Sequence, residues 1–122
     1  ALAPEYGSKM AAGFSNYGKK NVDIYAPGVQ IYATTPNQSY KFLQGTSMAS
    51  PNVAGVAAMI RSYYPKLSAN QVKQIIMESG IPLKNTVSVG EDKHKVSFTD
   101  ASKTGKIVNA YNAIIMAEKM SK

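Results

Sequence analysis

The most informative stretch of the chain is Gln44-Gly45-Thr46-Ser47-Met48-Ala49-Ser50-Pro51-Asn52-Val53-Ala54-Gly55. In it, a serine follows a glycine-containing turn and precedes the apolar run Val53 to Ile60, which has the length of a core helix. Because this run is apolar on all sides, we expect the helix to be buried, with Pro51 in its first turn. Gly55, in mid-helix, indicates close approach of another backbone.

The serines at the start of this helix allow two interpretations. Backbone amides at a helix N-terminus lack partners and carry partial positive charge, so a nucleophilic Ser47 would have its developing oxyanion facing hydrogen-bond donors. Alternatively, Ser47 or Ser50 simply caps the helix. Spacing alone leaves both open, although the small residues Gly45, Ala49 and Gly55 favour a site that something approaches closely.

Upstream of this stretch, alternating apolar residues predict two short strands. The first covers Asn21–Ala26, Pro27-Gly28 turns the chain, and the second begins at Val29. Tyr40 to Leu43 forms a brief extended piece after a loop. The residues expected to face inward are Val22, Ile24 and Ala26 in the first strand and Val29, Ile31 and Ala33 in the second.

Downstream, the pattern predicts two more helices. Ser68 and Gln71 have the spacing of a capping box, and Gly80 ends the helix that they begin. The last helix starts near Asn109. The inward-facing residues are Val72, Ile75 and Ile76 in the earlier helix and Ala110, Ala113, Ile114 and Ala117 in the last. Between them, Val87–Val89 and Val96–Phe98 flank a polar tip and predict a hairpin.

Composition narrows the function classes. The chain has 122 residues, of which 44% are hydrophobic and 17% charged, as in one globular domain. No apolar run reaches the roughly 18 residues of a membrane span. The absence of cysteine excludes a disulfide framework, a thiolate zinc site and a cysteine nucleophile.

The formal net charge of +7 raises the question of nucleic-acid binding. The lysines are scattered, however, and Lys19-Lys20 is the only adjacent pair. We therefore expect no nucleic-acid partner. An acidic half of the same domain, outside this chain, explains the imbalance better.

The run Gly45 to Gly55 resembles the active-site serine motif of the subtilisin-like serine proteases, the subtilases. The resemblance covers most of the chain and is weakest over 83–104; it includes Phe14–Gly18, Val22–Gly28, Ile31–Thr35, Val72–Ser79 and Gly105–Ala110. It implies an α/β fold, the C-terminal portion of a subtilisin-like parallel sheet with flanking helices. Residues 1–122 would then be a C-terminal fragment of a peptidase catalytic domain.

The resemblance also implies roles for individual residues. Ser47 would be the acylating nucleophile of a serine endopeptidase, and Thr46 beside it would support the oxyanion. Met48 and Phe14 would lie on the leaving-group side, and Gln44 would make a backbone contact to the far side of the polypeptide substrate; for Phe14, a place in the core is an equal alternative. The family often has His where this chain has Asn52, a position that takes no part in the chemistry.

In the family the catalytic Asp, His and oxyanion-hole Asn precede the serine along the chain, so the resemblance implies that all three lie upstream of this sequence. We therefore expect the fragment alone to be inactive, with the missing N-terminal half as its partner and self-association in its absence. The alternatives are a non-catalytic pseudoprotease and a protein-binding module. The resemblance implies a secreted or cell-envelope location, although the chain carries no targeting segment.

Other chemistry-bearing residues receive plainer interpretations. His94, the only histidine, lies in the polar hairpin tip and is expected to be exposed, not to serve as the base. The carboxylates Asp23, Glu91, Asp92 and Asp100 are too scattered to suggest a metal site. The sequence thus indicates no cofactor in this stretch, and structural calcium in a longer parent chain is left open.

Overall fold

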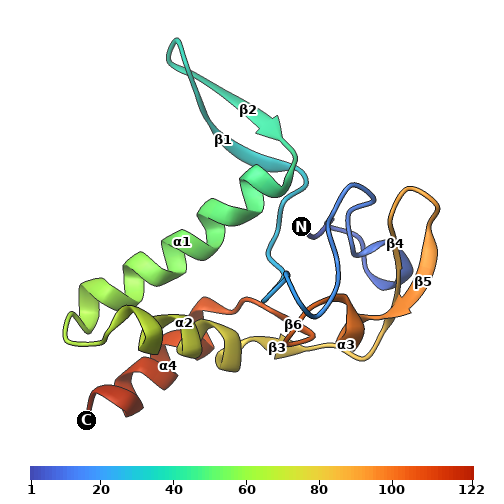
Figure 1. The fold of residues 1–122 in the computed structure, drawn as a ribbon. Helices are drawn as coiled ribbons and strands as arrows, with labels where there is room; N and C mark the ends of the chain where they lie inside the picture. Colours follow the sequence, from blue (N-terminus) through green and yellow to red (C-terminus); the bar gives the residue numbers. More distant parts are fainter.

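The computed structural model describes residues 1–122 and combines helices with short strands (Figure 1). The helices α1, α2 and α4 gather near the C-terminus, the hairpin β4–β5 lies at the opposite end, and the hairpin β1–β2 projects from the start of α1. In chain order the elements are η1 (Gly7–Lys9), β1 (Ile31–Thr35), β2 (Ser39–Leu43), α1 (Thr46–Tyr63), α2 (Ala69–Ser79), β3 (Ile81–Pro82), β4 (Thr86–Val89), β5 (His94–Ser97), α3 (Phe98–Ala101), β6 (Lys106–Ile107) and α4 (Ala110–Ser121).

Three short segments lie side by side and parallel between the two ends of the molecule: one at Leu2, a central segment at Tyr25–Gly28, and one at Lys106–Val108. The N–H of Leu2 donates to the Ala26 carbonyl (2.8 Å), and its own carbonyl accepts from Gly28 (3.0 Å). On the other side, Tyr25 donates to Lys106 (3.1 Å) and accepts from Val108 (2.9 Å). These are the bonds of a parallel ladder, and the other pairings, β1–β2, β3–β6 and β4–β5, are antiparallel.

The first predicted strand differs from its expected pattern. The structure buries Tyr25 and Ala26, whereas Val22 and Ile24 are only half-buried, and ladder bonds begin at Tyr25. The reason is tertiary: the Tyr25 ring packs on Phe98 with a centroid distance of 5.3 Å. Its hydroxyl donates to the Asn16 carbonyl at 2.9 Å, which satisfies the polar end of a buried side chain.

Two clusters of apolar side chains form the core. One joins the N-terminal segment to the β4–β5 hairpin, and the other lies among α1, α2 and α4. The capping box is confirmed: Ser68 Oγ accepts from the Gln71 N–H (3.2 Å), and the Gln71 side chain accepts from the Ser68 N–H (2.8 Å). Asn109 caps α4 as expected.

The serine-bearing helix α1 departs from its prediction in two ways. It begins at Thr46, so Pro51 lies inside the helix and not in its first turn. It is also buried along one side only, through Val56 and Ile60, because α2 and α4 cover that side. The other side is exposed, and nothing lies within 4 Å of the position that a Cβ on Gly55 would take.

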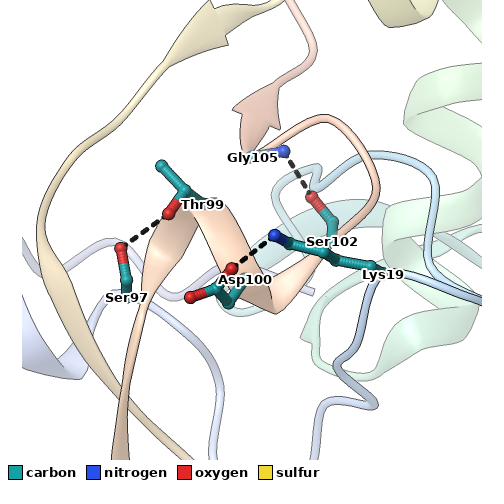
Figure 2. A network of polar contacts seen from close by, with 6 residues as sticks. All are labelled: Lys19, Ser97, Thr99, Asp100, Ser102 and Gly105. Atoms are coloured by element: carbon teal, nitrogen blue, oxygen red, sulfur yellow. Dashed lines mark hydrogen bonds and ion pairs between the residues drawn. The ribbon is translucent and has the colours of Figure 1, made fainter.

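The predicted hairpin is confirmed as β4–β5, and α3 follows it directly. Figure 2 shows how polar contacts hold this corner: Lys19 pairs with Asp100, and the buried Ser102 hydroxyl accepts from the Gly105 N–H at 3.0 Å. Gly105 has φ +59°, and a Cβ there would come within 2.8 Å of the backbone of Thr99.

None of the helices combines the length and the hydropathy that a membrane-spanning helix needs.

Candidate active site

Ser47 is the second residue of α1, and its side chain is exposed. The helix N-cap is Gly45, with φ 144°, a conformation that favours glycine, and no side chain caps the helix. The interpretation of Ser47 or Ser50 as the cap is therefore wrong, because both lie inside α1. The Ser47 hydroxyl makes no hydrogen bond within the chain and is free to meet a reactant.

The backbone around Ser47 is under-bonded. The first amides of a helix lack intrahelical acceptors and carry partial positive charge. Pro51 has no N–H to offer, so the Ser47 carbonyl also lacks its usual partner four residues on. The Met48 N–H donates to the Gly45 carbonyl at 3.0 Å, so the free donors beside the exposed Ser47 hydroxyl are the N–H groups of Thr46 and Ser47, which suit a group that develops negative charge.

The turn Pro27-Gly28 fixes where α1 begins. The Gly45 N–H donates to the Gly28 carbonyl at 2.7 Å. A Cβ on Gly28 would come within 2.8 Å of the Gly45 oxygen and 3.2 Å of the Ala49 Cβ. Only glycine at position 28 leaves room for Gly45 and Ala49 to come this close. Gly28, the last residue of the central segment, therefore directly supports the start of α1.

Asn52 makes a second connection to the same turn. Its side-chain amide donates to the Pro27 carbonyl at 2.9 Å and to the Met48 carbonyl at 3.3 Å. No pattern in the sequence indicated these two hydrogen bonds. Asn52 therefore holds α1 against the turn, a structural task at a position where the family often carries histidine.

Two hollows are lined by residues at or just before the start of α1, and Ser47 itself lines neither of them. A hollow of about 400 Å³ contains Phe14 and Gln44, and one of about 520 Å³ contains Thr46, Ser50 and Val53. Phe14 is 48% exposed, so its alternative assignment to the core is wrong. The fold thus brings Phe14 and Gln44, thirty positions apart in sequence, to one hollow, and Gln44 precedes Ser47 by three residues in the chain.

Met48 follows the serine and is half-buried. Its sulfur lies 3.6 Å from the position that a Cβ on Gly45 would occupy. The thioether therefore folds back over the glycine turn, next to the backbone that carries Ser47.

His94 lies at the start of β5 and has no bond to Ser47. Its Nδ1 is 2.9 Å from Asp92 Oδ1, and its ring meets the Tyr17 ring edge-on, with centroids 5.1 Å apart. The hydrogen bond from His94 lowers the pKa of the Asp92 carboxyl below its ordinary value. The His94 side chain is 40% exposed, in agreement with the sequence expectation.

The carboxylates are distributed among separate ion pairs. Asp23 pairs with Lys73 at 3.2 Å, Asp100 pairs with Lys19, and Asp92 bonds His94. No three His, Asp or Glu side chains lie together in a way that could hold a metal ion.

Comparison with known proteins decides the family. A family model described as the subtilase family matches residues 4–112. The chain belongs to the subtilase family. The Gly45 to Gly55 motif predicted this family and an α/β subtilisin-like fold, and both predictions are confirmed.

The subtilase relatives are longer than this chain. It is 44% identical to Subtilisin DY of Bacillus licheniformis over 84 residues, which cover 69% of this chain and 30% of that protein. It is 47% identical to the Thermostable alkaline protease of Halalkalibacterium halodurans over 79 residues, covering 65% and 22%. The chain thus spans less than a third of these relatives.

Solved protein structures agree with the fold. A chain of the subtilase cytotoxin SubAB assembly superposes with a TM-score of 0.73 at 29% identity, covering 95% of this chain and 32% of that one. The Prenylagaramide maturation protease PagA gives a TM-score of 0.62 at 29% identity, covering 88% and 38%.

Proposed function

We propose that the full-length protein carrying this chain is a serine endopeptidase in which Ser47 forms the acyl-enzyme, and that residues 1–122 are a C-terminal portion of its catalytic domain. The observation that carries the proposal is the position of Ser47. Its unbonded, exposed hydroxyl lies in the first turn of α1, inside a motif that belongs to the subtilase family. Attack of Ser47 Oγ on a peptide carbonyl would form the acyl-enzyme and release the amine.

Neighbouring residues would serve this reaction by position. Thr46, first in α1, would support the oxyanion together with the unpaired amides of the helix start. Phe14 would lie on the leaving-group side and Gln44 would make a backbone contact to the far side of a polypeptide substrate; that both line one hollow is consistent with a single extended substrate site. Met48 would line the leaving-group side, next to the nucleophile.

The remaining catalytic groups would come from another part of the same domain. Ser47 has no base within hydrogen-bond reach, and a serine hydroxyl is a weak nucleophile until a neighbour takes its proton. The exposed side of α1 supports an N-terminal half that packs there: two hollows, which share Ile24 and Val53, run along it. Alone, the fragment would be inactive and would bury this side by self-association. From the family we also propose a secreted or cell-envelope location.

The test uses the full-length protein and its Ser47→Ala variant. Hydrolysis of an internally quenched peptide and labelling by a fluorophosphonate probe, mapped to Ser47, would support the proposal. The variant should lose both while keeping the circular dichroism spectrum and unfolding midpoint of the parent. Full-length protein that cleaves nothing and takes no label would instead be a pseudoprotease or a binding module. Hydrolysis by Ser47→Ala at the parental rate would reject Ser47 as the nucleophile.

A further inference from the structure

The hollow that holds Phe14 and Gln44 has a far wall that the sequence did not indicate. Lys9 of η1 contributes to it, as do Ser88 and Lys93 of the β4–β5 hairpin. The hairpin lies in the region where the resemblance to subtilases is weakest. With a volume of about 400 Å³, the hollow is large enough for one or two amino-acid side chains.

The charge of this hollow is unbalanced. Its only charged lining residues are Lys9, Lys93 and Glu5, two cations against one anion. Neither lysine forms an ion pair, although Lys19, Lys73 and Lys122 elsewhere in the chain do. Both ammonium groups are therefore available to a ligand.

The position of Lys93 is held by the tip of the hairpin. Lys93 has φ 54°, and its N–H donates to the Gly90 carbonyl at 3.2 Å. Gly90 has φ +73°, and the Asp92 carboxylate lies 2.8 Å from the position its Cβ would take. Asp92 bonds His94, whose ring rests on Tyr17. His94 and Asp92 therefore stabilise the tip of the hairpin, a structural role that does not involve proton transfer.

We propose that this hollow is a specificity subsite for the leaving-group side of the substrate, in which Lys9 and Lys93 select an acidic side chain. The inference rests on the proposed function and adds the substrate class to it. Phe14 would contact the apolar part of the bound segment, Gln44 its backbone, and the two lysines its carboxylate.

The test compares matched quenched peptides hydrolysed by the full-length protein. The peptides differ only in carrying Glu, Gln or Lys at the second, third or fourth residue after the scissile bond. At low ionic strength, kcat/KM should be about three- to fivefold higher for Glu than for Gln at one of these positions, the size that a partly exposed ion pair provides. Added salt should reduce the ratio.

Variants assign the effect to the two lysines. The double variant Lys9→Met with Lys93→Met should bring the Glu to Gln ratio to about one, and Lys93→Arg should retain it. Lys95→Met is the matched control, because Lys95 lies on the same hairpin, is exposed and does not line the hollow. Fluorophosphonate labelling of each variant verifies that it folds.

The outcomes separate the two proposals. Hydrolysis with no preference for Glu, or with a preference that survives the double variant, overturns the subsite and leaves the protease assignment standing. If the full-length protein hydrolyses none of the peptides and takes no label, the proposed function fails and the subsite fails with it.

Discussion

The side-chain amide of Asn52 donates a 2.9 Å hydrogen bond to the carbonyl of Pro27, joining the second turn of α1 to the end of the central segment. One residue further on, the Gly28 carbonyl accepts from the Gly45 N–H at 2.7 Å. Two consecutive carbonyls of one turn therefore fix both the cap and the second turn of the serine-bearing helix. The position of Ser47 therefore depends on these two hydrogen bonds to Pro27 and Gly28 as well as on the residues of its own motif.

Replacing Asn52 with Leu should lower the free energy of unfolding by about 1 kcal/mol, the usual net worth of one such hydrogen bond. Chemical denaturation of the two proteins measures this difference. Asn70→Leu is the matched control, since Asn70 is exposed in the first turn of α2 and its side chain makes no hydrogen bond. Equal effects of the two substitutions would show that the bond to Pro27 contributes nothing.

Gly28→Ala should destabilise the protein by about 1–3 kcal/mol, the range for forcing extra carbon into a packed site. The new Cβ would lie 2.8 Å from the Gly45 carbonyl oxygen, a backbone atom that cannot move without shifting the cap of α1. Turnover of the full-length protein should fall with stability. Gly13→Ala, where nothing lies within 4 Å, is the control, and an equally small effect at Gly28 would contradict the close approach.

Gly55→Ala should have opposite effects in two settings. In the 122-residue chain it should stabilise α1 by about 1 kcal/mol, because alanine is the better helix former and nothing lies within 4 Å of the new methyl group. In the full-length protein the same change should destabilise, because a backbone from the N-terminal half would pack at this glycine. Unfolding midpoints of both proteins decide the matter, and stabilisation in both would argue against a covering segment there.

Structural features that depend only on residues close together in the chain were the ones predicted most accurately from the sequence. The capping box of Ser68 and Gln71 needs only two residues three apart, and it formed as expected. The start of α1 was predicted too late, because Pro51 suggested a first turn while Gly45, through its φ of 144°, permits an earlier one. Pairing with Phe98 overrode the alternation that had favoured Ile24 over Tyr25 as the buried residue.

The candidate site was predictable only in part. Ser47 and its immediate neighbours came from one contiguous motif that is dense enough to name a family. The hollow near the start of α1 brings together Phe14, Gln44 and Lys93, which are far apart in the chain and meet only through the tertiary fold. No local pattern indicates that Lys93 lines the same hollow as Phe14, so the sequence alone could not predict it.

Oxidation of Met48 to the sulfoxide should impair turnover of the full-length protein more than oxidation of any other methionine. The sulfoxide is bulkier and polar, and the Met48 sulfur lies against Gly45, beside the backbone of the nucleophile. Peroxide treatment followed by peptide mapping relates activity to each site. Met48→Leu should resist the loss, and full activity in protein with oxidised Met48 would disprove the effect.

The 122-residue chain by itself should show no specific labelling of Ser47 by a fluorophosphonate, compared with the denatured chain. Its hydroxyl has no base in reach, and the family's oxyanion Asn would also be missing; loss of that donor alone costs subtilisin about 10²–10³ in rate. The dipole of α1 contributes only about 0.3–1 kcal/mol at an exposed site and cannot replace either group. Adding the N-terminal half in trans should restore labelling if the halves associate. Labelling of the lone chain well above the control would mean that a base exists within it; His94, already bonded to Asp92, would be the residue to replace first.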